Sequence, residues 1–150
     1  MTQSSTSRGH AVFRATQLQD LVALTAFLDQ TCRQAGAGDD AVFAIRLAVE
    51  EVFTNIVQYG YGNQPGPITI SVDTEPERIT ITLADAALPF DPAAVAAPDL
   101  DAGWNERKIG GLGWHFAYQL MDEVKRESAG KRGNVFTLVK SLAENHAQSP

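Results

Sequence analysis

Apolar residues recur every three or four positions between about Asp40 and Tyr59, which predicts an amphipathic helix. Asp39 or Asp40 precedes the pattern, so we expect one of them to cap this helix and both to face its positive end. Gly60 or Gly62 should end it. At about 100° per residue, the apolar side chains form one stripe that must be buried: Val42, Ile45, Val49, Val52, Phe53 and Ile56.

Runs of alternating apolar and polar residues predict strands on both sides of that helix. Residues 67–73 and 78–84, PITISVD and RITITLA, should form a hairpin with one apolar face for the helix to cover. The other expected elements are a strand at 10–15, a helix at 17–34 ending near Gly36 and Gly38, a helix at 112–121, and strands at 123–128 and 134–140. We expect the cations of this last hairpin, in its strands and its turn, to hinder edge-to-edge pairing; they are Lys125, Arg126, Lys131 and Arg132.

Length and charge limit the number of domains and the kinds of partner that we expect. The chain has 150 residues, 44% of them hydrophobic, which suits one domain with a substantial core. We expect a disordered segment at 1–9, a folded domain at 10–141 and a flexible tail at 142–150. The formal charge of −6 argues against binding to nucleic acid or to an anionic membrane, so proteins and small ligands are the expected partners.

The cysteine, the histidines and the apolar runs exclude several further classes of protein. Cys32 lies in the helical pattern of residues 17–34 and is expected to be a small core residue. No zinc site is expected, because the histidines lack ligand spacing; they are His10, His115 and His146. No apolar run is long enough to cross a bilayer and the start lacks the core of a signal peptide, so we expect a cytoplasmic protein.

Two polar residues on the central helix are candidates for chemistry. Glu51 and Asn55 are one turn apart and project in nearly the same direction, away from the apolar stripe. A carboxamide oxygen suits Mg²⁺, and a carboxylate one turn away can accept a proton from a nucleophile. On this helix alone, a solvated surface for both residues is at least as good an interpretation.

Later features strengthen the functional interpretation. Asp85 ends the second strand of the hairpin, although an aspartate there is often only a turn residue. Residues 89–109 form a long segment with little periodicity, which we interpret as a lid. Arg107 and Lys108 end it, just before a glycine-rich turn that opens the helix at 112–121 and could offer free amides to phosphate; the turn consists of Gly110, Gly111, Leu112 and Gly113.

In their order and spacing, these parts resemble the GHKL or Bergerat-fold ATPase superfamily, and within it the small bacterial anti-sigma-factor serine kinases of the RsbW and SpoIIAB type. The similarity covers residues 13–140. Its boxes look like EEVFTNIVQYGY, DAALPFDP and GGLGWHFAYQLMDEVKRES. The resemblance implies an α+β fold: a two-layer sandwich whose mixed, mainly antiparallel sheet is covered on one face by about three helices, with an ATP lid.

The resemblance also implies roles for particular residues. Glu51 looks like the general base, Asn55 like the Mg²⁺ ligand, and Asp85 like the acceptor for the exocyclic amine of adenine. Arg107 or Lys108 would neutralise charge on the γ-phosphoryl group. The phosphates of ATP would lie against Gly111 and Gly113, with the nearby amides of Gly110 and Leu112. The family's partners are a STAS-type antagonist, phosphorylated on serine, and a sigma factor, and a homodimer is expected.

One residue departs from the family pattern. The first glycine box normally has glycine where this chain has Ala87. Glycine lets the backbone pass close to the nucleotide base and permits backbone dihedrals that other residues avoid. A methyl group can be accommodated there if φ is negative. Ala87 therefore favours an alternative function, a binding adaptor of the same fold that does not transfer phosphate. A histidine-kinase catalytic domain ranks last, since the chain has no upstream helical segment with a phosphoacceptor histidine.

Overall fold

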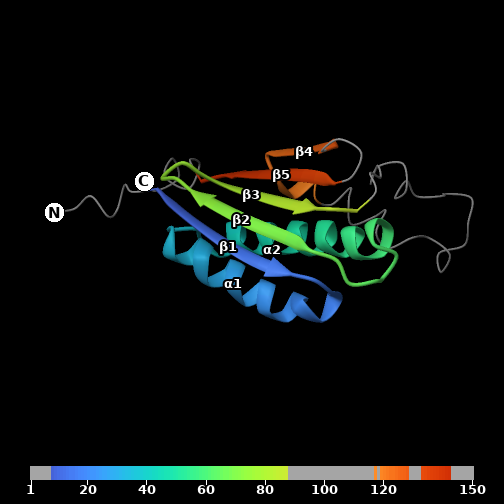
Figure 1. Ribbon diagram of the computed structural model, residues 1–150. Helices are drawn as coiled ribbons and strands as arrows, with labels where there is room; N and C mark the ends of the chain where they lie inside the picture. The colour runs from blue at the N-terminus through green and yellow to red at the C-terminus, as the bar shows by residue number, and fades with distance from the viewer. Residues whose placement is uncertain (1–7, 88–116, 118, 129–132, 143–150) are drawn as a thin grey trace, which may run out of the picture.

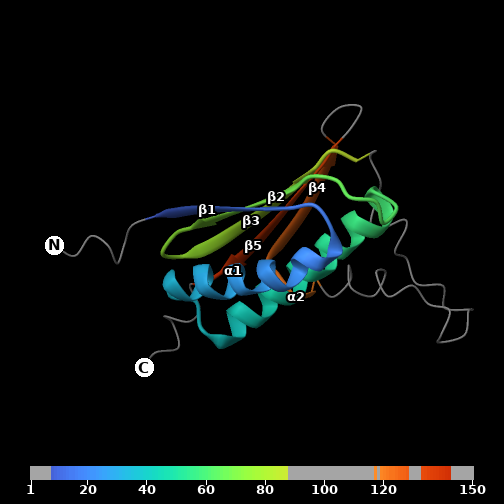
Figure 2. The same ribbon diagram turned by 60° about the horizontal axis from the view of Figure 1, so that its bottom comes forward.

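The computed structural model describes residues 8–87, 117, 119–128 and 133–142. Within them, a five-stranded sheet has the order β1-β2-β3-β5-β4, and every neighbouring pair is antiparallel. Helices α1 and α2 cover the same face of this sheet (Figures 1 and 2), which confirms the expected two-layer α+β fold. The elements are β1 (Gly9–Ala15), the 3₁₀ helix η2 (Leu18–Asp20), α1 (Leu21–Gln34), α2 (Asp39–Asn55), the π-helix η3 (Ile56–Gly60), β2 (Ile68–Thr74), β3 (Arg78–Asp85), β4 (Glu123–Ser128) and β5 (Asn134–Ser141).

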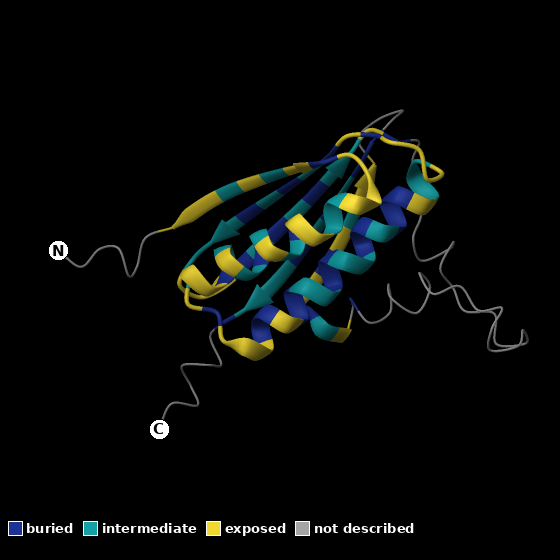
Figure 3. Cartoon of the chain, turned by 90° about the horizontal axis from the view of Figure 1, so that it is seen from below, coloured by how far each residue is buried: buried dark blue, intermediate teal, exposed yellow. Residues whose placement is uncertain are grey.

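The core lies between the helices and the sheet. Every residue of the predicted apolar stripe is buried, five of them on α2 and Ile56 at the start of η3. The exposed residues of α1 and α2 face away from the sheet (Figure 3). In each inner strand, every second side chain points toward the helices and is buried. Cys32 of α1 is completely buried in the same core, as predicted. Each fully buried Ile, Leu or Phe stabilises the fold by roughly 1.5–3 kcal/mol relative to an exposed one. The fully buried sheet residues include Ile70, Val72, Ile81, Leu83, Phe136 and Leu138.

The junction between α1 and α2 follows from a glycine at a left-handed position. Gly36 has φ +97°, its N–H donates to Arg33 O at 3.0 Å, and the Ala37 N–H donates to Cys32 O at 3.0 Å. These two bonds form a Schellman motif, which ends a helix by satisfying its last carbonyls. The predicted end of the first helix near Gly36 is thereby confirmed.

The predicted side-chain cap of the central helix is wrong. Gly38 occupies the N-cap position of α2, and no side chain caps it. Asp39 is already the first helical residue, and its carboxylate accepts a hydrogen bond from Arg33 Nη1 at 2.7 Å. Both acidic residues, Asp39 and Asp40, do lie in the first turn near the positive end of the helix dipole, as expected.

The C-terminal part of the sheet carries the expected hairpin. Strands β4 and β5 pair antiparallel, and β4 is an edge strand, so Lys125 and Arg126 lie where charge opposes edge pairing. Lys131 and Arg132 lie outside the described residues. Of the predicted helix 112–121, the described residues 117, 119 and 120 are helical. No helix in the described part of the chain is long and apolar enough to cross a membrane.

Candidate functional site

Asn55 ends α2 and is buried in an unusual way. Its side chain is 1% exposed, and neither its carboxamide oxygen nor its carboxamide nitrogen has a hydrogen-bond partner among the described residues. The solvated-surface interpretation is therefore wrong for Asn55. A buried polar group without a partner costs about 1–3 kcal/mol, and both carboxamide atoms of Asn55 stay unsatisfied within the described residues.

The helix changes its winding immediately after Asn55. Residues 56–60 form the π-helix η3, which ends with the Tyr61 N–H donating to Ile56 O at 2.9 Å. Single π-turns inside or at the end of α-helices occur frequently at functional sites. We predicted a regular helix as far as Tyr59, and the periodicity of the sequence does not reveal this change.

Glu51 lies one helical turn before Asn55 and is half-buried. Its pKa is raised, first because burial disfavours the charged carboxylate and second because Glu50 places another negative charge beside it. A carboxylate with a raised pKa binds a proton more readily than an exposed one, which suits a general base. Glu51 and Asn55 both lie on α2, one turn apart, and their roles stay predictions.

Asp85 is the last residue of β3 and is held by two neighbours. Its Oδ1 accepts hydrogen bonds from the Ala87 N–H at 2.9 Å and from Asn134 Nδ2 at 3.0 Å. Its Oδ2 is buried and has no partner among the described residues. Burial raises the pKa of Asp85, although the bonds from Asn134 and Ala87 act in the opposite direction. One oxygen is thus anchored, while the other has no donor among the described residues.

Ala87 fits its position without backbone strain. It is 1% exposed, and among the described non-glycine residues only Asn63 has a positive φ. The carbonyl oxygen of Ala87 accepts a hydrogen bond from the Gly133 N–H at 2.6 Å. Ala87 therefore has a negative φ, and its methyl group is accommodated in place of the glycine.

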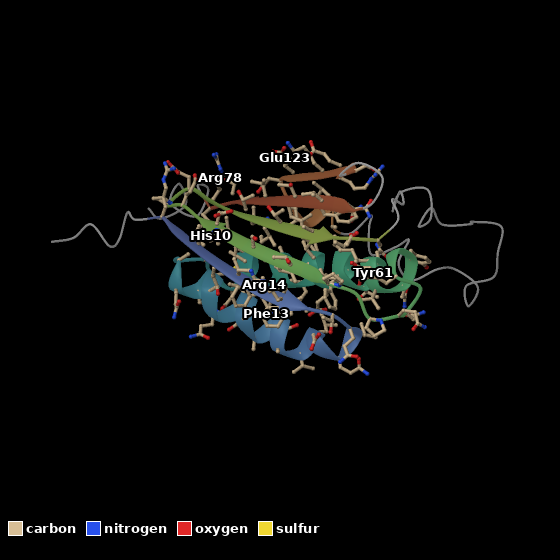
Figure 4. All side chains as sticks on the ribbon, viewed as in Figure 1. His10, Phe13, Arg14, Tyr61, Arg78 and Glu123 are labelled. Atoms are coloured by element: carbon tan, nitrogen blue, oxygen red, sulfur yellow. The ribbon has the colours of Figure 1, made fainter. Side chains whose placement is uncertain are left out.

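Tyr61 connects the end of the central helix, near Asn55, with the end of β3, near Asp85. The sequence analysis missed this residue. Its hydroxyl accepts a hydrogen bond from the Ala86 N–H at 2.7 Å and donates one to Pro67 O at 2.7 Å. A Cβ atom on Gly66 would clash with the tyrosine ring, so the loop before β2 packs closely on it. Tyr61 lies beside the end of η3, where β2 begins (Figure 4). The end of the helix is thereby tied to the residue that follows Asp85.

Asn134 is the second functional candidate that the sequence analysis missed. It is completely buried at the start of β5 and lies opposite Asp85 in the pairing of β3 with β5. A polar residue at the first position of an apolar strand was the available signal. Its meaning depended on the register of the two strands, which the sequence does not show.

The remaining predicted site residues cannot be placed. The lid and the glycine-rich turn fall within residues 88–116, outside the described residues. Their predicted roles stay predictions. The residues concerned are Arg107, Lys108, Gly110, Gly111, Leu112 and Gly113.

A cavity elsewhere in the molecule does not compete with this site. It measures about 550 Å³ and is lined by residues such as Gly9, Ala35 and Thr74. Thr74 ends β2, whereas Asp85 pairs with Ile68 at the start of β2, so the cavity lies at the other end of the sheet. None of the buried unpartnered polar atoms in the described residues belongs to its lining.

Known proteins with similar sequences support the fold and the order of the three sequence motifs. Residues 14–140 match the histidine kinase-like ATPase domain. The anti-sigma F factor of Geobacillus kaustophilus is 30% identical over 109 residues, which cover 72% of this chain and 75% of the relative. The anti-sigma F factor of Anoxybacillus flavithermus is 28% identical over 145 residues, covering 96% and 92%.

Two solved structures share the fold. One is the SiaB–SiaC complex from Pseudomonas aeruginosa, with a TM-score of 0.61 and 13% identity over 86% of this chain and 88% of that one. The other contains the RsbU and RsbW domains of a Mycobacterium tuberculosis protein, with a TM-score of 0.60 and 17% identity over 90% of this chain and 32% of that one. Sequence and structure together show that this chain belongs to the histidine kinase-like ATPase family, of the GHKL type that includes RsbW and the anti-sigma F factors.

Proposed function

We propose that this chain binds ATP with Mg²⁺ and acts as an anti-sigma factor that phosphorylates a serine of a STAS-type antagonist. The supporting observation is a pair of buried polar groups without partners, the Asn55 carboxamide on α2 and Asp85 Oδ2 on β3. The Tyr61 hydroxyl joins their two segments at one end of the sheet. Relatives named anti-sigma F factors support the choice of function within the family.

Asp85 would select the base. Because its Oδ1 already accepts two hydrogen bonds, the carboxylate cannot rotate freely and its Oδ2 is directed to one donor. An exocyclic amine, as in adenine, is such a donor, whereas the carbonyl of guanine or hypoxanthine is an acceptor and would be repelled. This predicts a preference for ATP over GTP and ITP.

Asn55 and Glu51 would act at the phosphates. The Asn55 carboxamide oxygen is a hard ligand and has no competing donor among the described residues, so it suits Mg²⁺, which would neutralise phosphate charge when bound. Glu51 would take the proton of the attacking serine hydroxyl on its carboxylate. Arg107, Lys108 and the amides of residues 110–113 are proposed to hold the phosphoryl oxygens. We also propose a cytoplasmic location, a sigma factor as the second partner, and a homodimer.

Titration calorimetry with ATP, with and without Mg²⁺, tests the site directly. We expect binding that Mg²⁺ strengthens in the wild type and that Asp85→Asn weakens by at least about tenfold, since a charge-assisted hydrogen bond is lost. Unchanged ATP affinity in Asp85→Asn would disprove the assignment of the base site. No binding to the wild-type protein would disprove the proposed function.

Phosphoryl transfer is tested with radiolabelled ATP and each STAS-type protein that a search of the source genome finds. Glu51→Gln should retain ATP binding and lose transfer, while the neighbouring Glu50→Gln should retain both. Transfer by Glu51→Gln at the wild-type rate would remove Glu51 from the role of general base. ATP binding by the wild type without transfer to any serine would instead establish the adaptor function.

A further inference from the structure

The two edge strands of the sheet differ in charge. Strand β4 carries both signs within its six residues: Glu123, Lys125, Arg126 and Glu127. Residues 8–15, which comprise β1 and the residue before it, contain Arg8, His10 and Arg14 but no acidic residue. Mixed charges oppose pairing with most strands, whereas charges of one sign select a strand of the opposite sign. Of the two edges, β1 is therefore the one suited to an added strand.

The outer side of β1 has no neighbouring strand in the described part of the chain (Figure 1). All seven residues of β1 pair with β2, from Gly9 opposite Thr74 to Ala15 opposite Ile68, and the register has no break. The strand contains no proline and no bulge that would hinder further pairing. In an antiparallel strand, about every second residue directs its backbone N–H and C=O away from its partner. These outward groups can pair with a strand from another molecule.

Arg8 and Arg14 are cations without an acidic partner among the described residues. Both are exposed, and Arg14 lies opposite the neutral Thr69 in the pairing of β1 with β2. Neither takes part in an ion pair that the described residues form. The nearby Asp73 is engaged, since its Oδ1 lies 2.6 Å from His10 Nδ1. The edge formed by β1 is thus positive, in a chain whose formal charge is −6.

A cavity lies beside the start of β1, between the sheet and the end of α1. It measures about 550 Å³, and its lining includes Gly9, Ala11 and the last turn of α1. At these two positions of β1 the side chain is absent or a single methyl group, which leaves the space open. Two residues further on, Phe13 faces the same side and packs on Phe27 of α1, with ring centroids 5.4 Å apart. A side chain from a strand added beside Gly9 or Ala11 can therefore reach the cavity.

The lining of this cavity suits an apolar side chain with an acidic residue nearby. Ala35 and Val72 supply apolar surface, and Arg8 supplies a cation. Glu75 also belongs to the lining, but its Oε1 lies 3.6 Å from Arg78 Nε, so its charge is already paired. The unpaired charge in the lining is therefore positive.

We propose that β1 is the docking edge for an extended acidic segment of a partner protein. The segment adds to the sheet beside β1, places acidic side chains near Arg8 and Arg14, and inserts an apolar side chain into the cavity beside Gly9 or Ala11. A second copy of β1 suits this edge poorly, because an antiparallel pair centred on Ala11 would place Arg8 opposite Arg14. The inference does not depend on nucleotide binding, since the cavity and Asp85 lie at opposite ends of the sheet.

The peptide Glu-Leu-Thr-Val-Thr-Leu-Glu, which is as long as β1, tests this edge in either strand direction because it reads the same from both ends. We expect the fluorescein-labelled peptide to bind the full chain with a dissociation constant of about 10–100 µM, measured by fluorescence anisotropy at low salt. A peptide with lysine in place of both glutamates reverses the charge. A peptide with proline in place of the central valine cannot pair as a strand. Each should bind at least about tenfold more weakly.

Variants of the protein locate the contacts. Arg8→Glu and Arg14→Glu should each weaken binding of the acidic peptide by about threefold to tenfold, and the double variant should prefer the lysine peptide. Lys125→Glu reverses an exposed cation on the other edge strand and should leave the affinity unchanged. Ala11→Leu fills the cavity and should weaken binding by about tenfold, with an unchanged circular dichroism spectrum.

Amide chemical shifts measured by NMR identify the surface even if a variant fails to fold. The acidic peptide should change the shifts of residues 8–15 and 31–36. Shift changes centred on α2 or β4 overturn the proposal, as does the absence of binding at about 1 mM peptide. Equal binding of the proline peptide, or equal affinity of the double arginine variant for the acidic peptide, also overturns it. Asp85→Asn should leave the peptide affinity unchanged, so a failure of the nucleotide site is distinguishable from a failure of this one.

Discussion

Glu51 and Asp85 are carboxyl groups in surroundings that resist their ionisation. In both, burial is the main reason that the pKa is raised, and for Glu51 the charge of Glu50 adds to it. The proposed roles nevertheless require the ionised forms, one to accept a proton and one to accept a hydrogen bond. As the pH falls, phosphoryl transfer and ATP binding should therefore be lost at a higher pH than they would be if the two carboxylates were exposed.

Removing the charge of Glu50 should change the pH dependence of transfer. In Glu50→Gln the pKa of Glu51 falls, because the ionised carboxylate is no longer repelled, and the acid limb of the transfer rate moves to lower pH. Transfer rates at saturating ATP over a pH series measure this shift. Glu77→Gln, in the exposed turn between β2 and β3, is the matched control and should leave the profile unchanged.

Asp85→Asn should stabilise the nucleotide-free protein relative to the wild type as pH rises. The folded-state pKa of Asp85 is raised above the unfolded value, so its contribution to stability is fully present below the unfolded pKa and is lost as pH rises through the folded pKa. Asparagine keeps an acceptor for Asn134 and Ala87 without the charge. Urea unfolding without nucleotide, between about pH 4 and pH 8, should show a difference that grows with pH. A difference that shrinks with pH would contradict the assignment.

At the scale of elements, the site depends on the meeting of three segments. The π-helix η3, the loop before β2 and the end of β3 are held together by the hydroxyl of Tyr61. Ala86, which donates to that hydroxyl, directly follows the residue proposed to bind the base. Tyr61 is thus a positioning residue, acting through the backbone beside Asp85.

Tyr61→Phe should weaken both stability and ATP binding. The ring packing on Gly66 remains, while two hydrogen bonds are lost to exposed groups that water can reach, so we expect a loss of about 1 kcal/mol in the free energy of unfolding. ATP affinity should fall several-fold, and by less in the Asp85→Asn background, because the two residues share one effect. Strictly additive losses of binding energy in the double variant would show that Tyr61 does not act through Asp85.

At the scale of the whole molecule, the unpartnered atoms are a local cost that a ligand would offset. The described part of the chain otherwise forms a continuous core, in which residues from the helices and the sheet are buried together. A ligand that binds only the folded state stabilises it by about 2.7 kcal/mol at a hundredfold excess over its dissociation constant. The melting temperature is therefore a global readout of the site.

We expect ATP with Mg²⁺ at that excess to raise the melting temperature by roughly 5–10 °C. In Asn55→Ala the part of the rise that requires Mg²⁺ should disappear, while the rise with ATP alone persists. Scanning calorimetry at one protein concentration measures this, since a dimer makes the melting temperature depend on concentration. An equal response to Mg²⁺ in Asn55→Ala would exclude Asn55 as the metal ligand.

Local patterns of the sequence were enough to predict most of the described elements. The alternation in residues 67–84 predicted the hairpin of β2 and β3, and the apolar stripe predicted which side of α2 is buried. The side-chain cap was one local prediction that failed, and the regular winding as far as Tyr59 was another. Asp39 has the right residue type for it, but the helix starts one residue too early and the carboxylate binds Arg33.

The sequence by itself determined the elements, the family and the residues with candidate chemistry, because periodicity and box order are properties of the chain read along its length. Only the tertiary structure decided that Asn55 is buried without a partner, that Asn134 holds Asp85, and that Tyr61 joins the helix to the strand end. Asn134 and Asp85 are 49 positions apart, and Tyr61 and Ala86 are 25 apart. Contacts over such separations depend on strand register and on the packing of α2 against the sheet, which no local pattern encodes.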